Sequence, residues 1–234
     1  MTVRGGIWMV ASLAAAMGCG GNGNGSGDTA ENPPGPVTPT SGPYQPLTVG
    51  TTWTYHVNDQ GVIYDKTSDV QAQEDIGGTK AGITGFRVRE NIKGAVQLTW
   101  YEPTATEVRR HHDQLMDGAG RLASDEWYDP YMLRIDLTPD HLQANASWSL
   151  SYIDTKTTST KPTEMVNHME TYHVDGVDVP VAVPAGTFAA LKLTRTDAAD
   201  GSTKTQWFVQ GIGKVKEQTG AGHLEELTAY QIAP

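Results

Sequence analysis

Apolar side chains alternate with polar ones through most of the chain after residue 47, and this period of two constrains the fold more than any other feature. Trp53, Tyr55 and Val57 share one face of the first run. Further runs of the same kind span 86–88, 96–100, 133–137, 148–152, 177–183 and 189–193. Successive side chains of a β-strand point to opposite faces, so each run predicts a strand with one apolar face and one wet face.

Turn-forming pairs lie between these runs at hairpin spacing: Gly77-Gly78, Lys93-Gly94, Asp175-Gly176 and Asp200-Gly201. Such pairs supply the left-handed backbone that tight hairpins need. We expect about ten to twelve strands, mostly antiparallel to their neighbours. So many strands in one domain must curl or close, which favours a curved antiparallel sheet, half-barrel or barrel over a sandwich. The chain is therefore predicted to be mainly β.

Helical signal is scarce, and we expect one or two short helices. Residues 138–144 are one candidate, with Thr138 as the cap and Pro139 in the first turn. Residues 114–127 are expected to hold another turn or two. The acidic residues in and around that segment are Asp113, Asp117, Asp125, Glu126 and Asp129. Their spacing does not match a calcium loop, so a solvated acidic loop is expected there.

The start of the chain has the form of an export signal. Arg4 precedes an apolar run over 7–17 that only Ser12 interrupts. The run suits a signal peptide and is too short to span a bilayer, which needs about 20 residues. It ends in Ala16-Met17-Gly18-Cys19, which resembles the lipobox of bacterial lipoproteins, although Leu is commoner where Ala16 stands. The resemblance implies removal of residues 1–18 and attachment of lipid to Cys19.

An ordinary secretory signal, cut near residues 14–16, is the alternative, and it would leave Cys19 as a free thiol. Lipid on Cys19 would be a firm anchor, because each buried methylene contributes about 0.8 kcal/mol and several acyl chains act together. In lipoproteins of enteric bacteria, Asp after the cysteine retains the protein at the inner membrane. Gly20 stands there instead, so we expect a protein of the outer membrane that faces the periplasm or the surface.

Residues 19–46 are predicted to form a lipid-anchored linker, and 47–234 the β-rich domain. The linker is rich first in Gly and Ser and then in Pro, so we expect a disordered tether. The formal net charge of −10 argues against a nucleic-acid partner. Arg109-Arg110 is a small basic patch that we interpret as a solvated strand face. The chain has one cysteine, Cys19, so no disulfide can staple the domain.

Three segments, 47–55, 183–188 and 206–216, resemble parts of a broad set of uncharacterised bacterial lipoproteins and secreted proteins. Those proteins share a VGxxWxY opening, a PAGTF turn and a WFxxGxGxVK closing hairpin. Some are similar to the curved antiparallel sheet of lipoprotein-carrier proteins, which wraps an apolar ligand. The resemblance implies such a sheet but no agreed activity. We expect Trp53 and Trp207 in these motifs to serve the core.

Residues able to do chemistry do not form a recognised motif. His111 and His112 are adjacent and would point to opposite faces of a strand, as would His168 and His173. A metal site assembled across strands, with His223, is the remaining alternative. The sequence has no Gly-x-Ser-x-Gly motif and no phosphate-binding glycine loop. We therefore expect a non-catalytic domain with no metal and no cofactor.

Aromatic residues offer a better lead to function. The segment 127–131 is expected to be irregular and either to line the mouth of a ligand site or to close one end of the sheet as a lid. The candidate ligand contacts are Trp100, Trp127 and Tyr131. The leading hypothesis is a lipid-anchored binding or envelope-accessory domain. Its expected partners are the membrane, through Cys19, and an apolar small molecule or an envelope protein. The alternatives are a structural or protein-interaction module without a cavity, and a metal-dependent or hydrolytic enzyme.

Overall fold

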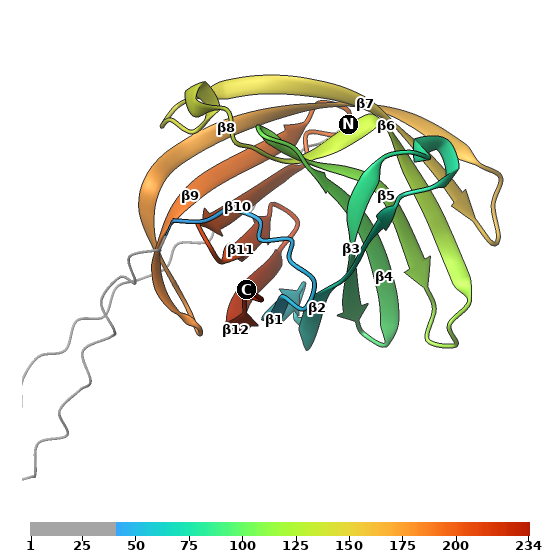
Figure 1. The fold of residues 1–234 in the computed structure, drawn as a ribbon, viewed down its shortest axis with the longest axis horizontal. Coiled ribbons are helices and arrows are strands. Elements are labelled where there is room, and N and C mark those ends of the chain that lie inside the picture. Colours follow the sequence, from blue (N-terminus) through green and yellow to red (C-terminus); the bar gives the residue numbers. More distant parts are fainter. Residues whose placement is uncertain (1–40) are drawn as a thin grey trace, which may run out of the picture. The chain divides into compact units, whose positions relative to one another are not determined.

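The computed structural model describes residues 41–234, which form a closed barrel of twelve antiparallel strands (Figure 1). Each strand pairs with the next along the chain, and β1 closes the barrel against β12. The prediction of a mainly β, barrel-like domain is confirmed. The predicted signal peptide, Cys19 and the first part of the linker lie outside the described residues. The strands are β1 (Thr52–Asp59), β2 (Val62–Asp75), β3 (Thr84–Ile92), β4 (Ala95–Pro103), β5 (Glu107–Met116), β6 (Leu122–Asp136), β7 (Ser147–Thr158), β8 (Glu164–Val183), β9 (Gly186–Asp197), β10 (Thr203–Val209), β11 (Gly213–Thr219) and β12 (His223–Gln231).

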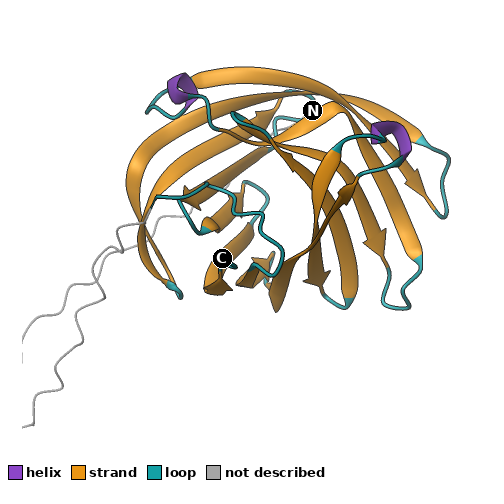
Figure 2. Cartoon of the chain, viewed as in Figure 1, coloured by secondary structure: helices purple, strands orange, loops and turns teal. Residues whose placement is uncertain are grey.

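The up-and-down order gives the barrel two distinct ends. At one end, which we call the hairpin end, short turns join β1 to β2, β3 to β4 and so on to β11 and β12. The other end, the strap end, carries the remaining connections. It includes both short 3-10 helices of the described region, η1 (Gly78–Lys80) and η2 (Pro139–His141), shown in purple in Figure 2.

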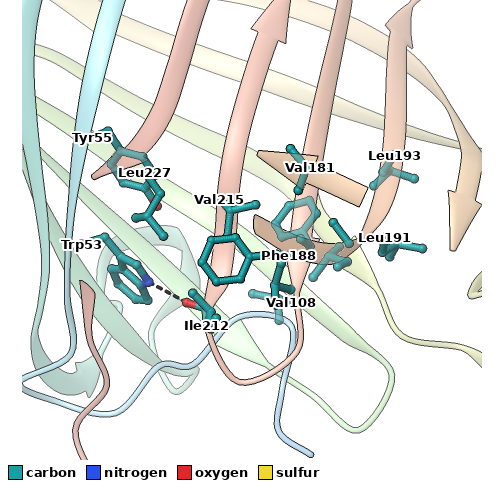
Figure 3. Packing of buried hydrophobic residues seen from close by; sticks show 14 of the residues in the cluster. Trp53, Tyr55, Val108, Val181, Phe188, Leu191, Leu193, Ile212, Val215 and Leu227 are labelled. Carbon is teal, nitrogen blue, oxygen red and sulfur yellow. Dashed lines mark hydrogen bonds between the residues drawn. The ribbon is translucent and has the colours of Figure 1, made fainter. Parts of the chain in front are cut away.

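The barrel interior is apolar toward the strap end. The inward side chains there come from strands on every side of the barrel, and Figure 3 shows Phe188, Val215 and Leu227 within this cluster. The indole Nε1 of Trp53 donates to the carbonyl oxygen of Ile212 at 2.6 Å, so this large side chain is buried without an orphaned donor. Burying apolar surface at about 25 cal/mol per Å² makes this region the main source of stability.

The segment before β1 helps to close the strap end. Gln45, Pro46 and Leu47 are buried, and Tyr44 packs against the apolar cluster. The carbonyl oxygen of Pro43 accepts from the amide of Gly211 at 2.9 Å. The last part of the proline-rich stretch, before β1, thus covers core residues at this end of the barrel.

The Asp175-Gly176 hairpin that the sequence suggested is absent, because β8 continues through this pair as one strand of 20 residues. The pairing of β8 with β9 shifts register on both sides of Gly176. Asp178 has a φ of +55°, and a Cβ on Gly176 would lie 2.6 Å from Val179. The turn-forming residues here serve a bulge within a strand instead of a hairpin.

The helix expected over 138–144 is only the 3-10 turn η2, while the turns expected within 114–127 are wrong. That segment is the end of β5, a tight turn and the start of β6. The acidic residues around it are not a solvated loop, since Asp113 is buried on β5 and Asp125 lies on β6. Strand pairing overrides weak local preference here.

Candidate functional site

The half of the barrel interior nearer the hairpin end is charged. The apolar inward faces of several strands continue into ionic side chains at every second residue. On β9, Leu191 and Leu193 are followed by Arg195, and on β12 the buried Leu227 and Glu225 are two residues apart. A barrel interior that changes from apolar to ionic along its axis positions these groups within a low-dielectric wall.

A set of ion pairs centred on Glu225 joins three strands. Lys66 of β2 donates to the two Glu225 carboxylate oxygens at 2.7 and 2.8 Å. Lys214 of β11 donates to Glu225 at 2.7 Å and to Glu217 at 2.8 Å. All four side chains are at most 8% exposed. Burial would raise the pKa of Glu225, but Lys214 and Lys66 hold it well below its ordinary value.

These ion pairs also bear on the alternative of a metal site assembled across strands with His223. Ligand atoms of Glu217, His223 and Glu225 lie within 4.8 Å of one another, as a metal site requires. However, the ammonium groups of Lys66 and Lys214 already bind these carboxylates and supply the positive charge that a cation would bring. The arrangement is a buried ionic network and does not favour a metal.

A second buried network lines the opposite wall. The hydroxyls of Tyr152 and Tyr172 donate to Glu170 at 2.9 and 2.6 Å, and Arg195 lies 3.1 Å from the same carboxylate. Arg110 pairs with Asp113 and donates to its Oδ1 from Nε at 2.8 Å. The interpretation of Arg110 as part of a solvated strand face is therefore wrong, because its guanidinium lies inside the barrel wall.

Arg134 of β6 differs from the other cations of the interior. Among residues 41–234, no carboxylate lies within salt-bridge distance of its guanidinium. Its Nε donates to the amide oxygen of Gln45 at 3.4 Å, and its guanidinium carbon lies 5.0 Å from the centre of the Phe208 ring. The side chain is held in place, and none of the described carboxylates forms an ion pair with it.

Three cavities in the charged interior share lining residues, and Lys204 of β10 lines all of them. The hairpin cavity, of about 450 Å³, lies between Arg195, Asp197 and the turns at 200–203 and 219–221. The lumen cavity, of about 360 Å³, is bordered by Lys66, Glu90, Gln97, Thr99, Tyr101, Arg110, Arg134, Lys214, Glu217 and Glu225 among others. The cation pocket, of about 30 Å³, is lined by Arg110, Met132, Leu133, Arg134, Arg195, Lys204 and Gln206. The first two volumes fall in the range of small-molecule sites.

Around the lumen cavity and the cation pocket, positive charges outnumber negative ones, whereas three carboxylates and two cations line the hairpin cavity. Five cations and three carboxylates line the lumen cavity, and four cations with no carboxylate line the cation pocket. Glu217 raises the pKa of Lys204, but burial together with Arg195 and Lys214 holds it below its ordinary value. This surplus stands in a chain whose formal net charge is −10.

Two of the aromatic candidates, Trp100 and Trp127, lie elsewhere, on the outer face of the barrel. Trp100 of β4 and Trp127 of β6 stack on the two faces of His112, with ring centres 4.5 and 3.7 Å away. Gly78, in the connection between β2 and β3, lies against Trp127 of this stack, and a Cβ on Gly78 would lie 2.5 Å from the indole ring. The segment 127–131 is therefore neither an irregular loop nor a lid over the sheet end. It belongs to β6, at a register shift against β5.

The structure thus brings two of the three candidate ligand contacts together and separates the third. Trp127 lines an outer groove of about 430 Å³ with Ile153 and Met165, and neither Trp100 nor Tyr131 is among its lining residues. The hydroxyl of Tyr131 donates to Glu107 at 3.0 Å. Trp100 and Tyr131 therefore have structural roles here.

The histidines are also divided among separate partners. His111 pairs with Glu102 at 2.9 Å and His112 with Asp125 at 2.8 Å, so the adjacent rings do not converge. His168 pairs with Asp197 at 2.6 Å. The pKa of His112 is lowered, because burial outweighs the attraction of the nearby carboxylate.

Sequence reasoning missed the cations of the cavity walls, although a signal was present. Arg195 and Lys204 stand two residues from the buried Leu193 and Gln206 on their own strands, which places each on the inward face. Because every second residue of a strand shares a face, counting from the apolar inward residues could have located these cations. A charged residue on a strand is, however, ordinarily assigned to the solvent-exposed face.

Comparison with known proteins gives no further guide to this arrangement. No family model matches the chain, and no curated protein or solved structure matches it. No helix in the described region has the length and apolar character to cross a membrane. What the chain offers as a site is therefore the charged half of the barrel interior.

Proposed function

We propose that this chain is a lipid-anchored bacterial envelope protein whose barrel binds a small polar ligand in its charged interior without transforming it. The observation that carries the proposal is the set of cavities that share Lys204 as a lining residue and have ionic side chains in their walls. We propose a polar ligand in place of the expected apolar one, because the cavity walls are charged and none of the three aromatic candidates lines these cavities.

A binding role explains a costly feature of the fold. Taking charges out of water costs several kcal/mol per ion, and well-packed apolar residues often stabilise a fold as well or better. Apolar side chains fill the strap end of this barrel, whereas charged side chains surround cavities in the rest of its interior. Ionic walls around ligand-sized cavities are therefore better explained by recognition than by stability.

The ion pairs also favour binding over catalysis. A general acid needs a pKa near the working pH, whereas Lys214 and Lys66 keep Glu225 ionised. Glu170 is occupied by Arg195 and by two tyrosine hydroxyls. Carboxylates fixed in this way orient a ligand or its counter-charges and are poorly placed to transfer protons.

Filling the cavity tests the binding proposal. Gln97 lines the lumen cavity, while Leu98, the next residue on β4, belongs to the opposite face of the strand. We expect members of a defined panel of sugars, sugar acids, sugar phosphates, amino acids and dicarboxylates to raise the melting temperature of the full chain. Gln97→Trp should abolish the shift and Leu98→Trp should keep it. A panel without effect, or equal binding by both variants, would refute the proposal.

The anchor has its own test. Mass spectrometry of the mature amino terminus should find an acylated Cys19, and Cys19→Ala should release the protein from the membrane fraction. An unmodified terminus at another residue, or a Cys19→Ala variant that still sediments with membranes, contradicts the lipoprotein assignment.

A further inference from the structure

We propose that the cation pocket is a subsite for an oxyanion, so that the ligand carries a carboxylate or a phosphate group. The inference rests on the proposed binding function and narrows its ligand class. Three arginines and a lysine from four strands, β5, β6, β9 and β10, line this pocket, with no acidic residue among them. Like charges gathered in a buried wall repel one another, and an anion at their centre removes that repulsion.

The carboxylate partners of the four cations in the cation pocket show which cation is free to pair with a ligand. Arg110 has Asp113, Arg195 has Glu170, and Lys204 lies 3.0 Å from Glu217. Only Arg134 among the pocket's four cations has no carboxylate partner within residues 41–234. A bound oxyanion would give Arg134 a negatively charged partner, as the other three cations of the pocket already have.

Arg134 is also built to present its charge. The Phe208 ring lies against the guanidinium and the Gln45 amide oxygen accepts from Nε, so the side chain is oriented before any ligand arrives. The terminal nitrogens are left to bind two oxygens of one carboxylate or phosphate side by side. Preorganisation of this kind reduces the entropy that binding must overcome.

The size and walls of the neighbouring cavity describe the rest of the ligand. The cation pocket, at about 30 Å³, has room for about two water-sized atoms, which suits the oxygens of one acidic group. The adjoining lumen cavity offers Gln97, Thr99 and Tyr101, whose polar groups suit hydroxyls. A hydroxylated acid, such as a sugar acid or a sugar phosphate, fits this combination.

Calorimetric titration of the full chain with simple probes tests the subsite itself. Inorganic phosphate and acetate test the oxyanion without a ligand body, and glucose 6-phosphate and glucuronate are compared with glucose. Arg134→Gln removes the unpaired charge. Arg134→Lys keeps the charge but loses the two terminal guanidinium nitrogens that can bind two oxygens side by side. The control is Arg121→Gln, since Arg121 lies on the exposed turn before β6 with its side chain 80% exposed.

We expect at least one simple oxyanion to bind, and both acidic sugars to bind more tightly than glucose. Arg134→Gln should weaken the acidic probes by about tenfold or more, with a smaller loss in Arg134→Lys and none in Arg121→Gln. If neither phosphate nor acetate binds, or if Arg134→Gln and Arg121→Gln behave alike, the inference is refuted. Glucose binding as tightly as its acidic forms would refute it too, yet would leave the proposed polar-ligand function standing.

Discussion

Replacing Glu225 by Gln should destabilise the barrel far more than the same change at the next residue. Glu225 is 5% exposed and accepts from Lys66 and Lys214 at 2.7–2.8 Å, so removing its charge leaves two buried ammonium groups short of a partner. Breaking a buried pair from one side typically costs 3–5 kcal/mol. We expect about 3 kcal/mol for Glu225→Gln, because the amide oxygen still accepts one hydrogen bond.

Glu226 provides the matched control. It lies on the outer face of β12 and pairs with Lys216 at 2.7 Å, with both side chains partly exposed. A pair of this kind is worth about 0–1 kcal/mol, so Glu226→Gln should change the free energy of unfolding by no more than that. Urea unfolding followed by tryptophan fluorescence measures both variants. Equal losses would show that the interior pairs are screened like surface pairs and would refute the reasoning.

The same variant should change how stability depends on pH. The folded-state pKa of Glu225 lies below its ordinary value of 4.5, so the unfolded chain takes up the proton first as pH falls. The wild-type contribution is therefore fully present above about pH 4.5 and is lost on acidification. Glu225→Gln has no such group, and its unfolding free energy should fall less steeply between pH 5 and pH 3 than that of the wild type. A wild type and variant with parallel pH profiles would contradict this.

Three further predictions concern the core and the outer wall. Leu227→Ala should cost about 2–5 kcal/mol in urea unfolding, because its side chain is fully buried in the apolar half. The imidazole of His112, followed by NMR, should titrate below 6.5, so that its burial lowers the stability of the fold as pH falls through 6.5; a midpoint above 6.5 would contradict this. Gly78→Ala should cost more than Gly82→Ala, since both have positive φ but only the first would drive a Cβ against Trp127.

Much of the fold followed from the sequence because one physical rule governs most of it. The alternation that begins with Trp53, Tyr55 and Val57 located the strands, and the number of strands required a curved or closed sheet. The prediction was wrong where a β-bulge has the residue composition of a turn. Asp175-Gly176 has the composition of a hairpin, but local composition does not distinguish a chain that reverses from one that only shifts register.

The candidate site was harder to predict, because it depends on which end of a closed barrel each residue occupies. The sequence places Trp100 in a predicted strand and Trp127 in a segment expected to be irregular, yet their stack on His112 arises only when three strands align. Arg134 looked like one polar residue among apolar neighbours on β6. Its significance comes from Arg195 and Lys204, about 60–70 residues away in sequence, which line the same pocket.

The charged interior limits how far alternation alone can be trusted in a barrel of this width. Alternation distinguishes two faces of a strand, and the apolar half of each strand tells which face is inward. On β9 the inward face passes from Leu193 to Arg195 without any change of period. A charged residue that continues the apolar, inward face of a strand is therefore informative. It marks where apolar side chains stop filling the barrel interior. In this chain such residues surround cavities of ligand size, and that coincidence is the physical reason to look for function inside the barrel.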